Sequence, residues 1–350
     1  MDLKEIELLL RSHDRLKKEI DPFRFTTGVE RVSEYPDVFG MNFEGMMACK
    51  TPEEQTEFFL HQEACAHVMR QLLGGNNIDE KLLYDAFGIT IEEFDDYKKS
   101  IDPVKKAIPS RLVVLCFDDA LLDQYEYAFP ILKEFGFGAT FFIAQKEVSP
   151  MGPAFSDKSV YMNWDQIAEL EKAGFELGNH SKHHIFGAHN KGYEFNLKEF
   201  KTMEEDMQAH GLKRPLSCAY PSGICNKDTY QAALNMGYLW GRGNNESGAY
   251  GMRGMTYYDP RFDSPLSMCN FGDPDFYTED LLEARITGAG KDQILGLTYH
   301  GVSPKNWAGP ISFRRHMEIL KSMDCTVIPV CGLEEYIDPR KALTYTEPFQ

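Results

Sequence analysis

The stretch RLVVLCFDDALLDQ, residues 111–124, decides the fold class of this chain. Its six consecutive apolar residues, 112–117, have the length and composition of a strand that is buried on both faces of a parallel sheet. The run ends at two adjacent carboxylates, Asp118 and Asp119. Because successive side chains of a strand point to opposite sides, the two acids can divide two roles between them. One can bind a cation while the other works on a proton.

Short apolar runs alternate with amphipathic segments through the rest of the chain. The expected strands are 112–117, 138–143, 175–178, 216–219, 238–240, 294–299 and 325–328, and the expected helices are 123–135, 164–173, 197–210, 226–236, 278–286 and 312–322. Strand then helix, repeated about seven times, predicts an α/β fold with a parallel sheet and outer helices, either closed into a barrel or doubly wound. Residues 241–276 interrupt this alternation and are expected to form a long functional loop.

The first 110 residues have a different character. Helix start signals occur at Thr51-Pro52-Glu53-Glu54 and at Thr90-Ile91-Glu92-Glu93, and two prolines in residues 101–110 mark a linker. We therefore expect a helical N-terminal extension over 1–110 and an α/β domain over 111–350. The extension could cover the sheet, form a lid or hold a homo-oligomer together through its helices.

Charge and composition exclude several classes of partner. With 37 basic and 54 acidic residues the formal charge is −17, which repels nucleic acid and anionic lipid surfaces. No apolar run reaches the roughly 18 to 20 residues that a membrane span needs. The start, MDLKEIELLL, lacks the apolar stretch of a signal peptide, so a cytoplasmic location is expected, unless the chain is a trimmed secretory precursor. Eight cysteines without a CxxC pair predict reduced, structural thiols.

Histidines follow the third expected strand, in FELGNHSKHH at 175–184. His180 and His184 are four residues apart, which places two imidazoles on one face if the segment turns helically. Two imidazoles and one carboxylate are a common way to hold Zn²⁺ or a related divalent ion with positions left for water and substrate. A solvated loop or core histidines are the alternative interpretation.

Two later strands also end in groups that can take part in chemistry. LSCAYPSG, 216–223, ends in a Tyr-Pro-Ser-Gly turn, which can present a backbone N–H to a substrate oxygen. ILGLTYHGVS, 294–303, carries His300, which can give a proton to a leaving group. Purely structural turns of this composition are also common.

In order and spacing these segments resemble the motifs of a known family. CFDD at 116–119, HSKHH at 180–184, AYPSG at 219–223 and LTYHG at 297–301 are similar to the motifs of the polysaccharide deacetylase family, which is also called the NodB homology family and includes carbohydrate esterases. The resemblance covers about residues 111–335. It implies a distorted (β/α) barrel of about seven parallel strands, preceded here by the helical extension.

The resemblance also implies roles for individual residues. Asp119, His180 and His184 would bind a divalent metal, with zinc expected first and cobalt, manganese or nickel as alternatives. Asp118 would be the general base and His300 the general acid.

Substrate-binding roles are implied for a second group of residues. The backbone N–H of Ser222, in the turn formed by Tyr220, Pro221, Ser222 and Gly223, would hold the developing oxyanion, and Leu297 would help to line a pocket for the acyl methyl group.

The chain departs from the family pattern at one position. Some members carry an arginine two residues before the proline of the third motif, where it contacts the base, and this chain has Ala219 there. Arg242 or Arg253 is expected to supply the cation instead. Among the three tryptophans, Trp307 is the candidate platform for a sugar ring, whereas Trp164 is expected in the core.

These observations together predict an enzyme. The expected activity is metal-dependent removal of acetyl groups from N- or O-acetylated carbohydrate, and soluble oligosaccharides or a cytoplasmic metabolite are plausible substrates. One alternative is a hydrolase of a small non-sugar amide on the same scaffold. The other is a catalytically silent carbohydrate-binding protein that keeps the metal for structure.

Overall fold

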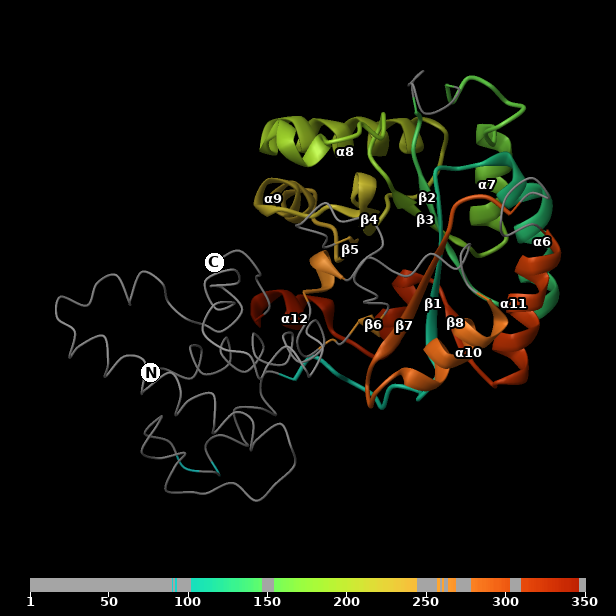
Figure 1. Ribbon diagram of the computed structural model, residues 1–350. Helices are drawn as coiled ribbons and strands as arrows, with labels where there is room; N and C mark the ends of the chain where they lie inside the picture. The colour runs from blue at the N-terminus through green and yellow to red at the C-terminus, as the bar shows by residue number, and fades with distance from the viewer. Residues whose placement is uncertain are drawn as a thin grey trace, which may run out of the picture. The chain divides into compact units, whose positions relative to one another are not determined.

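The computed structural model describes residues 90, 92, 102–146, 154–243, 257, 258, 260, 264–268, 278–302 and 310–345 (Figure 1). Nearly all described residues from Val104 onward belong to one compact unit. The helices expected in the N-terminal extension lie outside the described residues, so the boundary at residue 110 stays a prediction.

A single curved sheet forms the centre of this unit. Its strands are β1 (Leu112–Asp118), β2 (Thr140–Ile143), β3 (Glu176–Asn179), β4 (Ser217–Ala219), β5 (Trp240–Arg242), β6 (Tyr257–Tyr258), β7 (Ile294–Tyr299) and β8 (Thr326–Ile328). Their order is β5-β4-β3-β2-β1-β7-β6, with β8 paired to β1. All pairs are parallel except β6 with β7. The sheet curls into a half-barrel with helices outside it, which confirms the predicted distorted (β/α) barrel.

Strand β1 occupies the middle of the sheet and is buried at every residue. It pairs with β7 from Val113 to Phe117, with β8 at its beginning and with β2 at its end. This central position accounts for the unbroken apolar run of the sequence, because neither face of β1 meets solvent. It also puts the carboxyl end of β1, at Asp118, between β2 and β7.

Helices pack on the outside of the sheet. They are α6 (Phe129–Phe135), α7 (Trp164–Lys172), α8 (Tyr193–Ala209), α9 (Lys227–Asn235), α10 (Glu279–Gly288), α11 (Pro310–Ser322) and α12 (Pro339–Tyr345). In Figure 1, α6, α7 and α11 gather on one side of the sheet and α8 and α9 on another. Among the described helices, none combines the length and the apolar composition that crossing a membrane requires.

Local sequence explains where these helices begin. Asn163 caps α7 in a capping box with Gln166, and Asn226 caps α9 in the same way with Thr229. A π-helical turn, Gln124–Ala128, leads into α6. Wide turns of this kind occur often at functional sites.

Aromatic packing joins β1 to the helices on one side of the sheet. The ring of Phe117 stacks on Phe141 at a centroid distance of 4.8 Å and on Tyr299 at 5.7 Å, and it meets Phe313 of α11 edge-on. All four rings are fully buried. The strand ends that carry the polar residues therefore rest on a rigid core.

The expected loop over residues 241–276 is partly wrong. Strand β5 continues to Arg242, β6 forms at Tyr257 and Tyr258, and a short 3₁₀ turn spans Pro265–Ser267. A strand of two residues is too short to produce an alternating pattern in the sequence. The remaining residues of that range are outside the described part of the chain.

Candidate metal centre

Polar residues follow the carboxyl ends of five parallel strands and gather at one edge of the sheet. Asp118 and Asp119 come from β1, His180 and His184 follow β3, the turn at Ser222 follows β4, Arg242 ends β5 and His300 follows β7. Carboxyl ends of parallel strands lie at the same edge of a sheet, which is where α/β proteins build their sites.

Asp119, His180 and His184 form a group that could hold a metal ion. Their ligand atoms lie within 4.8 Å of one another. The Nε2 atom of each histidine is 3.7 Å from Oδ1 of Asp119. Tetrahedral zinc with ligand distances of about 2.0 to 2.2 Å separates its ligand atoms by about 3.3 Å. A small inward movement of these side chains would therefore surround one ion.

The two imidazoles are in the state that a metal requires. Nδ1 of His180 lies 2.8 Å from the carbonyl oxygen of Ala219, and because a carbonyl only accepts, Nδ1 carries the hydrogen and Nε2 is left as the ligand. Burial lowers the pKa of His180. Burial, followed by the nearby His180, lowers the pKa of His184 to about 4. Both rings are thus neutral near pH 7.

The two oxygens of the Asp119 carboxylate have different surroundings. Burial acts to raise its pKa, but His184, Lys146 and His180 outweigh burial and hold the pKa well below its usual range. Oδ2 accepts a hydrogen bond from Lys146 Nζ at 2.5 Å. Oδ1 is buried, faces both imidazoles and has no hydrogen-bond partner among the described residues. An ionised oxygen without a partner beside two neutral nitrogens fits a divalent cation.

Asp118 is held by a different cation. Arg242 donates a hydrogen bond from Nη2 to Asp118 Oδ2, and both residues are buried. Burial acts to raise the pKa of Asp118, but Arg242, His180 and His300 together outweigh burial, so the pKa is lowered. Arg242 thus supplies the cation beside Asp118 that the family pattern places at position 219, where this chain has alanine. The other candidate, Arg253, lies outside the described residues.

His300 stands on the open side of Asp118. Its Nε2 is 3.9 Å from Asp118 Oδ2, and its side chain is 47% exposed. A substrate can therefore reach the imidazole, which is the requirement for a proton donor to a leaving group.

The Tyr-Pro-Ser-Gly turn has a largely structural interior. Tyr220 is buried, and its hydroxyl donates to the carbonyl of Leu266 at 2.7 Å. The amide of Gly223 donates to the carbonyl of Tyr220 at 2.9 Å, and Pro221 is also buried. Ser222 has a left-handed backbone with φ +62°.

The structure describes two of the three remaining residues for which the sequence made a prediction. Leu297 is fully buried in the hydrophobic core, so the structure does not bring it to the surface of the site. Trp307 lies outside the described residues. Trp164 is partly buried against the core, as expected, and stacks on His210 at a centroid distance of 4.1 Å.

Glu199 of α8 fixes the segment that carries the two metal-ligand candidates. Its carboxylate accepts from the backbone N–H of His183 at 2.9 Å and lies 2.8 Å from His183 Nδ1. Its backbone carbonyl accepts from the N–H of Lys182 at 3.2 Å. His183 is therefore a structural contact of this segment. Neither Glu199 nor Lys146 stands in a motif, so no sequence signal pointed to them.

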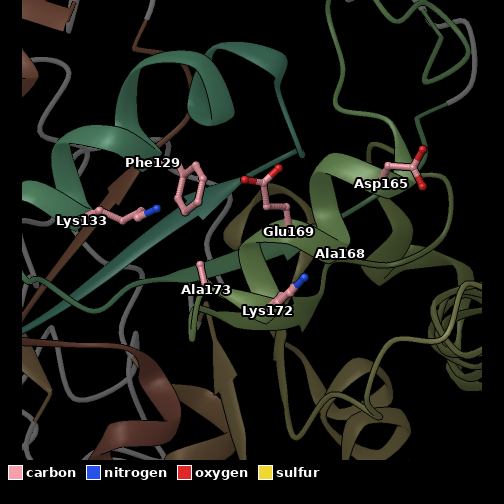
Figure 2. Close-up of a pocket in the computed structure, with 7 residues that line it drawn as sticks. All are labelled: Phe129, Lys133, Asp165, Ala168, Glu169, Lys172 and Ala173. Atoms are coloured by element: carbon pink, nitrogen blue, oxygen red, sulfur yellow. The ribbon is translucent and has the colours of Figure 1, made fainter.

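A separate pocket lies between α6 and α7 (Figure 2). Its lining residues are Phe129, Lys133, Asp165, Ala168, Glu169, Lys172 and Ala173. None of them follows a strand at the edge that carries the histidines. The pocket is therefore not part of the candidate metal centre.

Comparison with known proteins finds a family that matches part of the chain. Residues 105–240 match the model of the polysaccharide deacetylase family. A relative, poly-β-1,6-N-acetyl-D-glucosamine N-deacetylase of Staphylococcus aureus, is 29% identical over 192 residues, which cover 51% of this chain and 61% of that protein. The chain thus spans less than two thirds of the length of this relative.

Solved structures resemble the chain more distantly. A family 4 carbohydrate esterase from Streptomyces lividans in complex with acetate is 16% identical, with a TM-score of 0.41 over 62% of this chain and 91% of that one. The Streptococcus pyogenes deacetylase PplD in complex with acetate is 24% identical, with a TM-score of 0.36 over 52% of this chain and 72% of that one. On the match of sequence, the segment from residue 105 to residue 240 belongs to the polysaccharide deacetylase family.

Proposed function

We propose that this chain is a metal-dependent hydrolase that removes acetyl groups from acetylated carbohydrate. One observation carries the proposal: the grouped ligand atoms of Asp119, His180 and His184 lie beside a second carboxylate, Asp118, which is buried and paired with Arg242. The activity named for the Staphylococcus aureus relative, N-deacetylation of a glucosamine polymer, supports this choice of substrate class.

The residues around the centre can carry the steps of such a reaction. A bound divalent ion, zinc by preference, would acidify water and polarise the acyl carbonyl. Asp118 accepts the proton of the attacking water, because its Oδ1 has no hydrogen-bond partner among the described residues while Arg242 holds Oδ2. His300, exposed on the open side, donates a proton to the departing amine or alkoxide.

The backbone of the Tyr-Pro-Ser-Gly turn would complete the site. The left-handed conformation of Ser222 turns the chain at the edge where the other groups meet. We assign the Ser222 N–H to the developing oxyanion, because a fixed backbone donor needs no reorganisation when charge appears.

Removal of the metal tests the proposed function. We expect dialysis against a chelator to abolish release of acetate from N-acetylglucosamine oligomers, and addition of one equivalent of Zn²⁺ to restore it. Acetylated xylan and small non-sugar amides are measured beside the oligomers. Turnover of the amides alone would replace the proposal by the amide hydrolase. A protein that binds metal but turns over none of the three substrates would be the silent binding protein.

An exposed aromatic side chain close in sequence to the centre offers a second test of the substrate class. Phe186, two residues after His184, is 70% exposed, the largest value for a large apolar side chain among the described residues. The apolar face of a sugar ring packs well on an aromatic ring. We expect Phe186→Ala to raise KM for a glucosamine oligomer about three- to tenfold, equivalent to about 1 kcal/mol, and to leave kcat unchanged.

A matched variant controls for loss of exposed apolar surface. Leu216 is 40% exposed and precedes β4, at the opposite end of that strand from the site. Leu216→Ala should leave KM unchanged. Equal KM values for both variants and the parent protein would remove Phe186 from the substrate surface.

A further inference from the structure

Gln124 connects the two strands that carry the proposed base and the proposed acid. Its side chain is fully buried, and its Nε2 donates to the carbonyl oxygen of Asp118 at 2.5 Å and to that of His300 at 2.6 Å. Both partners are carbonyl oxygens, which only accept. The orientation of the Gln124 amide is therefore fixed by its surroundings, with the nitrogen between the two strands.

This bridge begins where the backbone pairing of the two strands stops. The ladder between β1 and β7 ends at the pair Phe117 and Tyr299. Asp118 and His300 are each one residue beyond this last pair. The Gln124 amide joins the two strands directly beyond their last paired residues.

Asp123 binds the backbone just after His300. Its Oδ2 accepts a hydrogen bond from the backbone N–H of Val302 at 3.0 Å. Asp123 and Gln124 together thus hold the backbone on both sides of Gly301, directly after His300. The π-helical turn that starts at Gln124 brings these two consecutive side chains to the end of β7.

The backbone matters for His300 because its side chain is 47% exposed, so the direction in which the chain leaves β7 decides where the imidazole points. We propose that Gln124 is a positioning residue that sets the place of the His300 imidazole relative to Asp118. This inference rests on the proposed function. The role of Gln124 is to keep the His300 imidazole aligned with the leaving group while Asp118 accepts a proton from the water.

Leaving-group dependence distinguishes this role from simple stabilisation of the fold. Release of an amine from an N-acetyl sugar needs a proton donor, whereas 4-nitrophenolate leaves from 4-nitrophenyl acetate without one. We expect Gln124→Met, which keeps the length of the side chain and removes the donor, to lower kcat on an N-acetylglucosamine oligomer about 10- to 100-fold. We expect its rate on 4-nitrophenyl acetate to stay within about twofold of the parent. His300→Ala should show the same selective loss.

Two further variants complete the experiment. Gln166→Met removes another glutamine hydrogen bond, in the capping box of α7, and should leave both rates unchanged. Asp123→Ala should show the selective loss in weaker form, and it serves in place of Gln124→Met if that protein does not fold. All variants are compared with one equivalent of Zn²⁺ bound.

The outcomes separate the inference from the function on which it rests. A parent protein without activity on either substrate would overturn the proposed function. The role of Gln124 alone would be overturned if the parent is active and Gln124→Met lowers both rates equally or lowers neither. The same holds for Asp123→Ala where it replaces Gln124→Met.

Discussion

Asp118→Asn is expected to lower kcat for release of acetate from an N-acetylated oligosaccharide by about 10²- to 10⁴-fold, the usual contribution of a positioned general base. The substitution keeps the size of the side chain and removes its ability to take a proton. Metal binding should persist at one equivalent, because the ligand group consists of Asp119, His180 and His184. Acetate release and metal content, measured on the same preparation, check both parts of the prediction.

Stability has to be measured alongside, because Arg242 would lose its charged partner. Leaving one member of a buried ion pair alone costs about 3 to 5 kcal/mol, so urea unfolding should show a lower midpoint for this variant. Asp157→Asn is the control, since Asp157 accepts from Ser159 at an exposed site and touches none of these groups. Full activity of Asp118→Asn would place the base elsewhere, whereas a parent protein that is itself inactive would favour the silent binding protein.

Asp119→Ala is expected to reduce metal binding below one equivalent at micromolar zinc and to abolish the activity with it. The substitution removes the one carboxylate of the group and leaves two neutral imidazoles, which hold zinc far less tightly than three ligands. Equilibrium dialysis against a zinc indicator gives the binding constant, and acetate release gives the activity.

The ion pair with Lys146 complicates this experiment and also supplies its control. Asp119→Ala breaks the contact between Lys146 and Asp119 as well as the ligand group. Lys146→Met breaks the same contact and leaves the carboxylate in place. We expect Lys146→Met to keep one equivalent of zinc. Loss of zinc from both variants alike would show that the ion pair, and not the carboxylate alone, determines binding.

The sequence was most informative where a local pattern has one physical explanation. An apolar run of six residues has to be buried on both faces, and β1 is found at the centre of the sheet with every residue buried. The sequence pattern also placed Asp119, His180 and His184 at strand ends that meet at one edge, and the structure brings them within 4.8 Å of each other.

Residues that act across the sheet were harder to predict. Arg242 meets Asp118 across 124 positions of sequence, and spacing alone could only narrow the choice to Arg242 or Arg253. Lys146 and Gln124 lie in no motif, and their contacts depend on the register of β1 with β2 and β7. A sequence shows which residues end each strand, but the contacts beyond those ends follow from three-dimensional register.

Five residues at this edge have the positive φ that residues other than glycine avoid, namely Asp119, Ala120, Ser181, His184 and Ser222. Each such position costs about 1 to 2 kcal/mol relative to a relaxed backbone. Selection for heat resistance alone would therefore favour glycine at these positions. Glycine at position 119 or 184 would remove a side chain that the metal centre needs. Thermal stability and activity therefore favour different residues at these positions. Variants selected only for heat resistance should be sequenced and assayed first for loss of activity through substitutions here.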